Sequence, residues 1–171
     1  MSLAAEWSVF WFNVLVYVLL VPMRMQLDVW LPDTFFAPGR WWYRTREWER
    51  DGDFYRDRLR IDRWKDRLPV ITSRNNFSKR RLVGNDRPYL EQFVLETCRA
   101  ESNHVRAIIS VLIMRLWTPP GLWFLCFLLA LWGNLPFILI QRHNRPRLQR
   151  ALERIAERTL SRGNEGDLQF A

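Results

Sequence analysis

The chain is 171 residues long, about one domain by length, and carries a formal net charge of +8 together with 10 Trp and 11 Phe. This composition is unusual for a soluble protein of that size and favours attachment to an anionic surface. Nucleic acid and phospholipid both fit the charge, so the length of the apolar runs decides between them.

The first apolar run, WSVFWFNVLVYVLLVPM at residues 7–23, has Ser8 and Asn13 as its polar interruptions. A cleavable secretory signal has positive charge before its apolar core and small residues after it. Here no Lys or Arg precedes Arg24, and the following VPMRMQ has no small-residue cleavage site. We therefore expect a retained membrane anchor over residues 7–24.

Residues 25–89 are expected to form a cytoplasmic segment at the membrane surface, because they mix aromatic residues with both charge signs. Aromatic rings favour the headgroup level, and arginines favour lipid phosphates. Proline and glycine are expected to break the segment into short interfacial helices, at Pro32, Pro38, Gly39, Gly52 and Pro69. Residues 73–88 are expected to be a solvated loop, with phosphate binding by Lys79, Arg80 and Arg81 as the alternative.

Residues 90–140 are expected to form a helical hairpin. Its second arm, at 119–140, contains no charge and is long enough to cross about 30 Å of hydrocarbon. Its first arm, at 90–117, is apolar in the second half and polar in the first. Ionisable groups at membrane depth are costly and usually face a cavity or partners, so this polar half is a candidate site. Between the arms, Pro119 and Gly121 favour a tight turn.

The chain ends in a basic tail, whose residues 141–162 are predicted to form an amphipathic helix that begins near Pro146. The apolar positions of this helix are Leu148, Leu152, Ile155, Ala156 and Leu160. An apolar face between basic faces is typical of a helix that lies on anionic headgroups. Residues 163–171 are predicted to be a flexible tail.

Together these elements predict one all-α integral membrane domain over residues 1–171, with about three membrane-embedded helices and amphipathic interfacial helices. Crossings are expected at 7–24, 100–117 and 120–140. Residues 1–23 contain no Lys or Arg, whereas the middle of the chain and the tail are rich in arginine. Because basic segments stay in the cytoplasm, the amino terminus is expected outside the cell membrane and the carboxyl terminus inside.

The hairpin is expected to bring two polar clusters together. At about 1.5 Å per residue, the arm that descends from Gly121 matches about 20 residues counted back from Thr118, which end near Arg99. The two clusters are ETCRAESNH at 96–104 and QRHN at 141–144. We therefore expect both at the cytoplasmic face of the membrane.

Helical spacing places Glu101 and His104 on one face of the first cluster. A carboxylate beside a histidine raises the pKa of the ring and can fix its tautomer, and both effects help a general base. A structural polar network at a helix end is the alternative. Glu-x-x-His is also half of a carboxylate-bridged metal site, but the chain has no second such pair, so no metal is predicted.

Several common chemistries have no motif in this chain. There is no Gly-rich phosphate loop, no Cys pair with metal spacing and no Gly-x-Ser-x-Gly elbow, and neither His104 nor His143 begins a His-x4-Asp acyltransferase motif. The cysteines are isolated. Cys126 is expected to be a core residue, and Cys98 is more easily explained by packing than as a nucleophile.

Four strings, in this order along the chain, resemble one family: LPDTFF at 31–36, RWKDRLP at 63–69, ETCRAESNH at 96–104 and QRHNRPRL at 141–148. They resemble the small membrane acyltransferases that act on glycosyl-4,4'-diaponeurosporenoate, in the last step of staphyloxanthin formation. The resemblance implies a bacterial cell-membrane enzyme that moves a long fatty acyl group onto a sugar hydroxyl of a membrane lipid. The chain is unusually rich in Arg and Trp, so another glycolipid or a polyprenyl acceptor is the alternative to a carotenoid.

The resemblance and the two clusters together give the candidate site residues. His104, steadied by Glu101, is expected to take the proton from the acceptor hydroxyl. The other catalytic candidates are Glu96, Arg99, Arg142 and Asn144, the last three as donors to the oxyanion. The substrate-binding candidates are Asn103, Gln141, Trp64, Lys65, Arg67 and Arg145, the last three as ligands of donor phosphates.

The implied co-substrate is an acyl thioester, either acyl-CoA or acyl carrier protein, and no bound cofactor is predicted. The expected partners are the lipid or glycolipid acceptor, the acyl donor and an anionic phospholipid surface, and nucleic acid is not among them. The sequence does not indicate an oligomeric state. A non-catalytic membrane scaffold or subunit that recruits a lipid-modifying enzyme is the alternative function.

Overall fold

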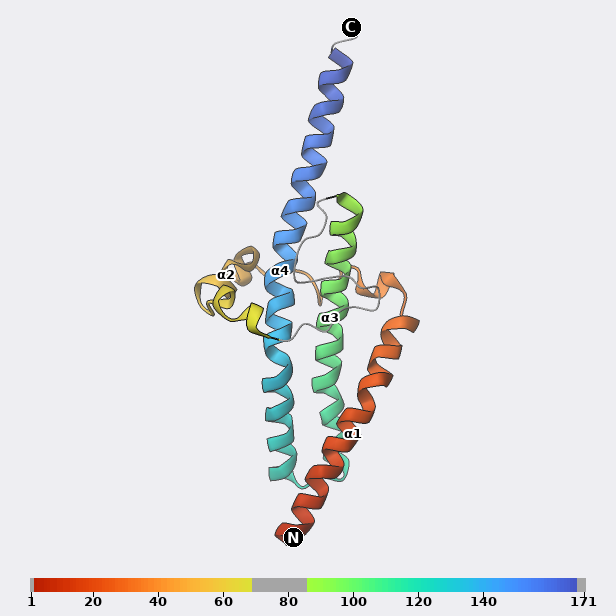
Figure 1. Ribbon diagram of the computed structural model, residues 1–171, viewed down its shortest axis with the longest axis vertical. Coiled ribbons are helices and arrows are strands. Elements are labelled where there is room, and N and C mark those ends of the chain that lie inside the picture. The colour runs from red at the N-terminus through yellow and green to blue at the C-terminus, as the bar shows by residue number, and fades with distance from the viewer. Residues whose placement is uncertain (1, 69–85, 169–171) are drawn as a thin grey trace. The chain divides into compact units, whose positions relative to one another are not determined.

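The computed structural model describes residues 2–68 and 86–168, and every regular element within them is helical, which confirms the all-α class for this part of the chain. The α-helices are α1 (Leu3–Trp30), α2 (Asp53–Asp57), α3 (Arg87–Ile113) and α4 (Pro120–Leu168), with 3₁₀ helices at Asp33–Phe36, Glu47–Gly52, Ile61–Arg63, Lys65–Arg67 and Met114–Leu116 (Figure 1). The chain divides into two compact units. Unit 1 holds Met1–Ala37 and Arg99–Leu139, and unit 2 holds Pro38–Cys98 and Ile140–Ala171.

Helix α1 extends beyond the predicted anchor at 7–24 in both directions. It passes through Pro22 and ends at Trp30, and Leu31 then adopts extended backbone before Pro32. The residue before a proline avoids helical dihedral angles, which explains this end of the helix.

The turn between α3 and α4 lies where the sequence predicts it. The 3₁₀ helix Met114–Leu116 follows α3, and α4 begins at Pro120, whose fixed φ suits the first position of a helix. The carbonyl oxygen of Pro119 accepts the first helical hydrogen bond, from the backbone N–H of Trp123 at 2.8 Å. Proline thus starts α4, and the tight reversal is confirmed.

The interior of unit 1 is formed by the buried Val111, Met114 and Ala130, against which Tyr17 and Trp123 pack. These residues come from α1, the second half of α3, the 3₁₀ helix that follows it and the first half of α4. The indole N–H of Trp123 donates to the backbone oxygen of Val111 at 3.0 Å, so the aromatic ring has a polar partner as well as apolar contacts.

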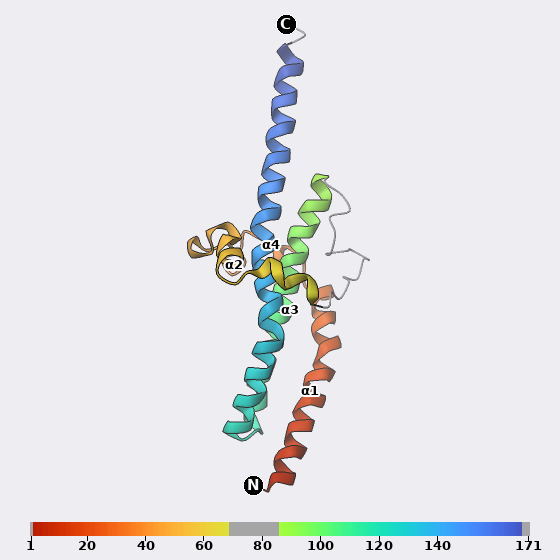
Figure 2. The ribbon, with the colours of Figure 1, turned by 60° about the vertical axis from the view of Figure 1, so that its left-hand side comes forward.

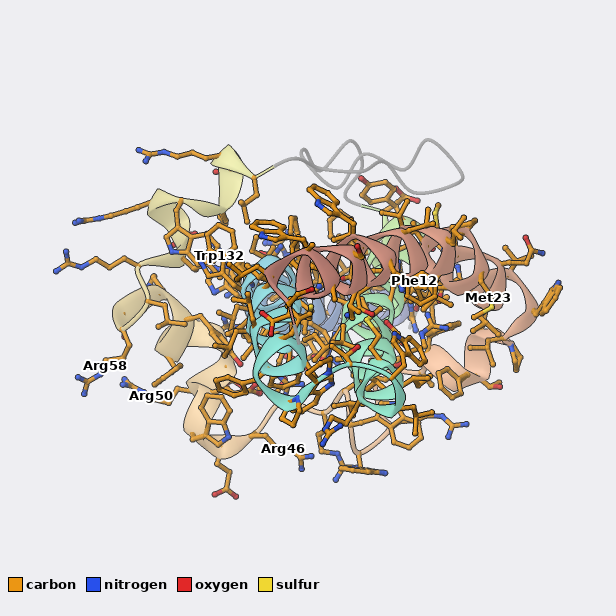
Figure 3. All side chains as sticks on the ribbon, turned by 90° about the horizontal axis from the view of Figure 1, so that it is seen from below. Phe12, Met23, Arg46, Arg50, Arg58 and Trp132 are labelled. Atoms are coloured by element: carbon orange, nitrogen blue, oxygen red, sulfur yellow. The ribbon has the colours of Figure 1, made fainter. Side chains whose placement is uncertain are left out.

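Helices α1 and α4 leave many large apolar side chains exposed. Trp132 is 79 % exposed, and Figure 3 shows it together with the exposed Phe12 and Met23. Among the described helices, two are long and apolar enough to cross a membrane, Leu3–Trp30 and Pro120–Thr159, and only 6% and 11% of their most apolar windows are buried. The core helix of a soluble protein is mostly buried, so this exposure favours association with lipid.

Helix α3 is not one of these two apolar helices. Its charged residues include Glu96, Glu101 and Arg106, in agreement with the polar first half that the sequence indicates. A third crossing at 100–117 therefore stays a prediction.

Helix α4 is one uninterrupted helix, as Figures 1 and 2 show. It continues through Pro136 and Pro146, so the prediction that a new helix begins near Pro146 is wrong. A proline inside a helix removes one backbone hydrogen bond, and the packing of the buried Pro146 outweighs that cost. The predicted flexible tail is also helical as far as Leu168, and 169–171 lie outside the described residues.

Unit 2 has its own apolar core, in which Leu90, Phe93 and Val94 of α3 are buried together with Leu148 of α4. The partly buried residues around it are Tyr89, Ala151, Leu152 and Ile155. Part of the apolar face of the tail helix therefore packs against α3, and its contact with the membrane surface stays a prediction. Helical periodicity shows that a face is apolar but does not show what covers it.

The segment before α3 contains short helices, as predicted, and Gly52 at the junction of Glu47–Gly52 with α2 has a positive φ of 91°. The predicted break at Pro69 lies outside the described residues, as does most of the predicted loop at 73–88 with Lys79, Arg80 and Arg81.

Candidate functional site

In unit 2, a buried carboxylate receives three hydrogen bonds. Glu49 is 1% exposed, and its Oε1 accepts from Arg142 Nε at 2.5 Å and from the hydroxyl of Tyr55. Its Oε2 accepts from the backbone N–H of Arg46 at 2.6 Å. Burial by itself raises the pKa of Glu49, but the hydrogen bonds from Arg142, Tyr55 and Arg46 outweigh it, and the pKa lies below its ordinary value. Burial and then the bond to Glu49 raise the pKa of Tyr55.

The guanidinium group of Arg142 holds the chain segment around Glu49. Besides the ion pair with Glu49, Nη1 donates to the backbone oxygen of Trp42 at 3.3 Å and Nη2 donates to that of Arg44 at 3.2 Å. The three bonds point in different directions from one planar group, which a lysine cannot reproduce. Arg142 therefore fastens residues 42–49 to α4.

His143, the residue after Arg142, fastens the neighbouring turn. Its Nδ1 lies 3.1 Å from the backbone oxygen of Gly52, which can only accept, so Nδ1 carries the proton. Its Nε2 then accepts from Nη1 of Arg147 at 3.1 Å, with Asp62 at 3.5 Å. Both ring nitrogens of this buried side chain thus have structural partners.

Gly52 is required where it lies. A Cβ atom at Gly52 would come within 2.9 Å of the backbone oxygen of His143, and the positive φ is itself unfavourable for other residues. Arg50 and Asp51 also have positive φ, of 49° and 54°. Through this turn of positive φ values, the backbone of Gly52 comes into direct contact with the backbone of His143 on α4.

Arg145 is 2% exposed, although the sequence predicts it as a ligand of donor phosphates. Its Nε donates to Thr97 Oγ1 at 3.0 Å, its Nη1 donates to the backbone oxygen of Tyr43 at 2.7 Å, and its guanidinium lies 5.5 Å from the Tyr43 ring centre. This geometry joins α4 to α3 inside unit 2. It argues against direct contact between Arg145 and a phosphate.

The other predicted site residues of unit 2 range from its surface to its interior. Arg67 is exposed, Lys65 Nζ pairs with Asp66 at 3.0 Å, and the indole N–H of Trp64 donates to the backbone oxygen of Leu59 at 3.0 Å. Gln141 and Asn144 are half-buried on α4, and Glu96 is buried on α3, where it accepts from Gln92 at 3.1 Å.

In unit 1, His104 lies in a chain of polar side chains. Its Nδ1 is 2.9 Å from Oδ1 of Asn134, whose Nδ2 donates to the hydroxyl of Tyr17 at 2.9 Å. The imidazole stacks on Phe137, with ring centres 4.8 Å apart and planes 5° apart. Arg24 Cζ lies 4.9 Å from the ring centre of Tyr17. These residues come from α1, α3 and α4.

Two ion pairs link α3 to the chain around the end of α1. Arg99 pairs with Asp33 and has its guanidinium 5.2 Å from the ring centre of Phe36, and Arg106 pairs with Asp28. Asp33 and Phe36 belong to the string LPDTFF, and Arg99 belongs to ETCRAESNH. Two of the four strings that carry the resemblance therefore contact each other in unit 1.

Several of these residues were not predicted from the sequence. The sequence predicts Glu101 as the neighbour of His104. In the structure, the partner of Nδ1 of His104 is Asn134. One signal for Asn134 was available, because it is a polar residue in an uncharged apolar run. The sequence offered no comparable signal for Glu49 or Tyr55.

Glu101 lies on α3 and is 5% exposed, and Asn103, on the same helix, is half-buried. The predicted bond between Glu101 and His104 stays a prediction. Cys98 is completely buried, in keeping with a packing role. Within residues 2–68 and 86–168, no group of three or more His, Cys, Asp or Glu side chains is arranged to hold a metal ion.

The family model and the relatives that match this chain carry the same name. The family model described as glycosyl-4,4'-diaponeurosporenoate acyltransferase matches residues 39–154. A relative with this name from Staphylococcus haemolyticus (strain JCSC1435) is 30% identical over 151 residues, which cover 87% of this chain and 84% of the relative. Another, from Staphylococcus aureus (strain MRSA252), is 28% identical over 145 residues, which cover 83% of this chain and 87% of the relative.

No solved structure matches the chain. The family model spans well over half of the sequence, and both relatives align over most of their own length. The chain therefore belongs to the glycosyl-4,4'-diaponeurosporenoate acyltransferase family.

Proposed function

We propose that the protein transfers a long fatty acyl group from an acyl thioester to a sugar hydroxyl of a glycosylated membrane isoprenoid. The names of the relatives support a glycosylated carotenoid as the acceptor class. The membership in an acyltransferase family favours catalysis over the alternative of a scaffold. Acyl-CoA and acyl carrier protein are the two candidate donors.

The protein acts as an integral membrane enzyme in this proposal. The exposed apolar surfaces of α1 and α4 support membrane insertion, because both helices have the length and composition of a crossing. A lipid acceptor and a long acyl chain also reach such an enzyme from the bilayer. Arg46, Arg50 and Arg58, whose exposed side chains extend from unit 2 in Figure 3, are proposed contacts for anionic headgroups.

His104 is the general base in the proposed reaction. It takes the proton of the acceptor hydroxyl as the oxygen attacks the carbonyl carbon of the thioester. The tetrahedral intermediate then collapses, the C–S bond breaks, and the leaving thiolate recovers the proton from the imidazolium. The products are an ester and a thiol. Glu101 supports the positive charge of the ring, and Arg99 is the proposed donor to the oxyanion.

The observation that carries this assignment is the polar chain Tyr17, Asn134 and His104, which links α1, α4 and α3 in unit 1 and in which Tyr17 packs against the apolar core of that unit. Polar groups in such surroundings are costly and usually serve a site. The second histidine, His143, has both nitrogens bound in the interior of unit 2. His104 is therefore the histidine of this chain that suits proton transfer.

The test is acyl transfer by purified protein in lipid nanodiscs, with a labelled long-chain acyl-CoA or acyl carrier protein and a glycosylated carotenoid. We expect His104→Ala to lower turnover by roughly a hundredfold or more, since general-base catalysis contributes about that much. Val105→Ala, at the exposed next position of α3, is the matched control and is expected to keep normal turnover. Normal turnover of a correctly inserted His104→Ala protein would refute the assignment.

A further inference from the structure

The side-chain amide of Asn134 has one orientation that its neighbours allow. Its Nδ2 lies 2.7 Å from the backbone oxygen of Ala130, and a carbonyl oxygen only accepts hydrogen bonds. A reversed amide would bring two repelling oxygen atoms to that distance. The NH₂ group therefore donates to Ala130 and to the hydroxyl of Tyr17, and Oδ1 faces His104.

This orientation decides which nitrogen of His104 carries the proton. Oδ1 of Asn134 can only accept, and it lies 2.9 Å from Nδ1 of His104. Nδ1 must therefore be the donor in this bond. In the neutral ring the lone pair then belongs to Nε2.

The ring of His104 is held in place as well as in its tautomer. Phe137 stacks on it with planes 5° apart, so a tilt of the imidazole would lose the stacking, and a half-turn in its plane would lose the bond of Nδ1 to Asn134. Asn134 is held in turn by Ala130 and Tyr17. The amide is therefore a preorganised acceptor for Nδ1–H.

We propose that Asn134 is a positioning residue, which holds His104 as the Nδ1–H tautomer and makes Nε2 the nitrogen that takes the acceptor proton. This inference rests on the proposed function of His104 as the general base. The bond to Asn134 strengthens when the ring becomes positively charged, so it also stabilises the imidazolium. An acceptor at the second nitrogen has the same role in hydrolases with a Ser-His-Asp or Cys-His-Asn arrangement.

The tautomer is measured directly by NMR of protein labelled with ¹⁵N-histidine. The chain contains 2 histidines, so the spectrum is assigned by comparison with His104→Gln. At about pH 9, where a histidine is ordinarily neutral, we expect the protonated-nitrogen shift at Nδ1 of His104 and the unprotonated shift at Nε2. The opposite pattern in the native protein would overturn the proposal, whatever any variant does.

Two substitutions of Asn134 then test its effect on turnover. Asn134→Asp keeps an acceptor for Nδ1–H and is expected to keep the tautomer, although its second carboxylate oxygen replaces the NH₂ group beside the backbone oxygen of Ala130 and is expected to lower stability. Asn134→Leu removes the acceptor and is expected to lose the tautomer preference and to lower kcat by roughly a hundredfold, with KM little changed.

Asn13→Leu is the matched control, because Asn13 is also a buried asparagine of unit 1 but bonds to Thr118 and Trp117. It is expected to lower stability and leave the tautomer of His104 unchanged. Native tautomer and kcat in Asn134→Leu would overturn the positioning role even with His104→Ala inactive. Conversely, an active His104→Ala protein would overturn the proposed function and leave the measured tautomer in place.

Discussion

At the scale of single residues, the buried side chains Glu49 and His143 each have partners of defined chemistry. Glu49 is charged because donors surround it, and burial lowers the pKa of His143, in which one ring nitrogen donates to Gly52 and the other accepts from Arg147. A buried charge without such partners would destabilise the fold by several kcal/mol. Burial and bonding partners together therefore determine the protonation states of Glu49 and His143.

Glu49 should make stability depend on acid pH. Its pKa is lower in the folded protein than in the unfolded chain, so its contribution is present above the unfolded pKa of about 4.3 and is lost as pH falls through the folded pKa. We expect Glu49→Gln to lower the free energy of unfolding by about 3 kcal/mol at neutral pH, because Arg142 loses its counter-charge. The difference from native protein should shrink as pH falls below about 4. Unfolding curves of both proteins across this range measure it, and a difference independent of pH would contradict it.

Tyr55 should act at the other end of the pH range. Burial and the bond to Glu49 raise its pKa in the folded protein, so its contribution is present below the unfolded pKa of about 10 and is lost at higher pH. We expect Tyr55→Phe to lose part of the bonding to Glu49 and to flatten the alkaline fall in unfolding midpoint. An alkaline limb identical in the two proteins would assign that limb to other groups.

At the scale of elements, α4 is the helix to which the segment before α3 is attached in unit 2. Arg142, His143 and Arg145 follow one another closely in sequence, and they bind the backbone of Trp42, Gly52 and Tyr43 respectively. The string QRHNRPRL therefore makes specific bonds inside unit 2, which a stretch that served only as a basic membrane flank would not require. Its arginines hold a chain segment through several aimed hydrogen bonds, which depend on geometry as well as charge.

Arg142→Lys tests this explanation. Lysine keeps the charge that pairs with Glu49 but loses the two bonds to the backbone oxygens of Trp42 and Arg44. At about 1 kcal/mol per lost bond, we expect a loss of about 2 kcal/mol in the free energy of unfolding. Arg150→Lys is the control, because Arg150 makes one bond here, to the backbone oxygen of Asp51 at 3.2 Å, and little change is expected. A fall in kcat with native stability would instead favour the predicted role of Arg142 at the oxyanion.

How far the sequence predicts these elements depends on the range of the interactions. The apolar runs predict α1 and the start of α4, because length and composition are local properties. The continuity of α4 through Pro146 was not predicted, because a proline locally favours the start of a new helix and the packing of the buried Pro146 overrides that preference. The bond of His104 to Asn134 joins residues 30 apart, and that of Arg142 to Glu49 joins residues 93 apart. Such pairs follow from tertiary packing, which no spacing rule reveals.

At the scale of the whole molecule, apolar surface favours association with the membrane, and the distribution of charge along the chain predicts the orientation in it. The net charge is +8, but residues 1–23 contain no Lys or Arg. Most of the exposed large apolar residues of the described part lie on α1 and α4, the two helices long and apolar enough to cross a bilayer. Because basic segments remain in the cytoplasm, this asymmetry sets the expected orientation, with the amino terminus and the α3–α4 turn outside and the carboxyl tail inside.

Single cysteines test that orientation in intact cells, in a protein with Cys98→Ala and Cys126→Ala. Gly121→Cys lies in the first turn of α4, next to the α3–α4 turn, where a Cβ atom meets no neighbour within 4 Å, and a membrane-impermeant maleimide should label it from outside. Ser161→Cys, an exposed position of α4, should be labelled only after the cells are permeabilised. The pair controls for reactivity, because both cysteines should react in detergent. Labelling of Ser161→Cys from outside, or protection of Gly121→Cys, would reverse the orientation and place the basic tail away from a cytoplasmic acyl donor.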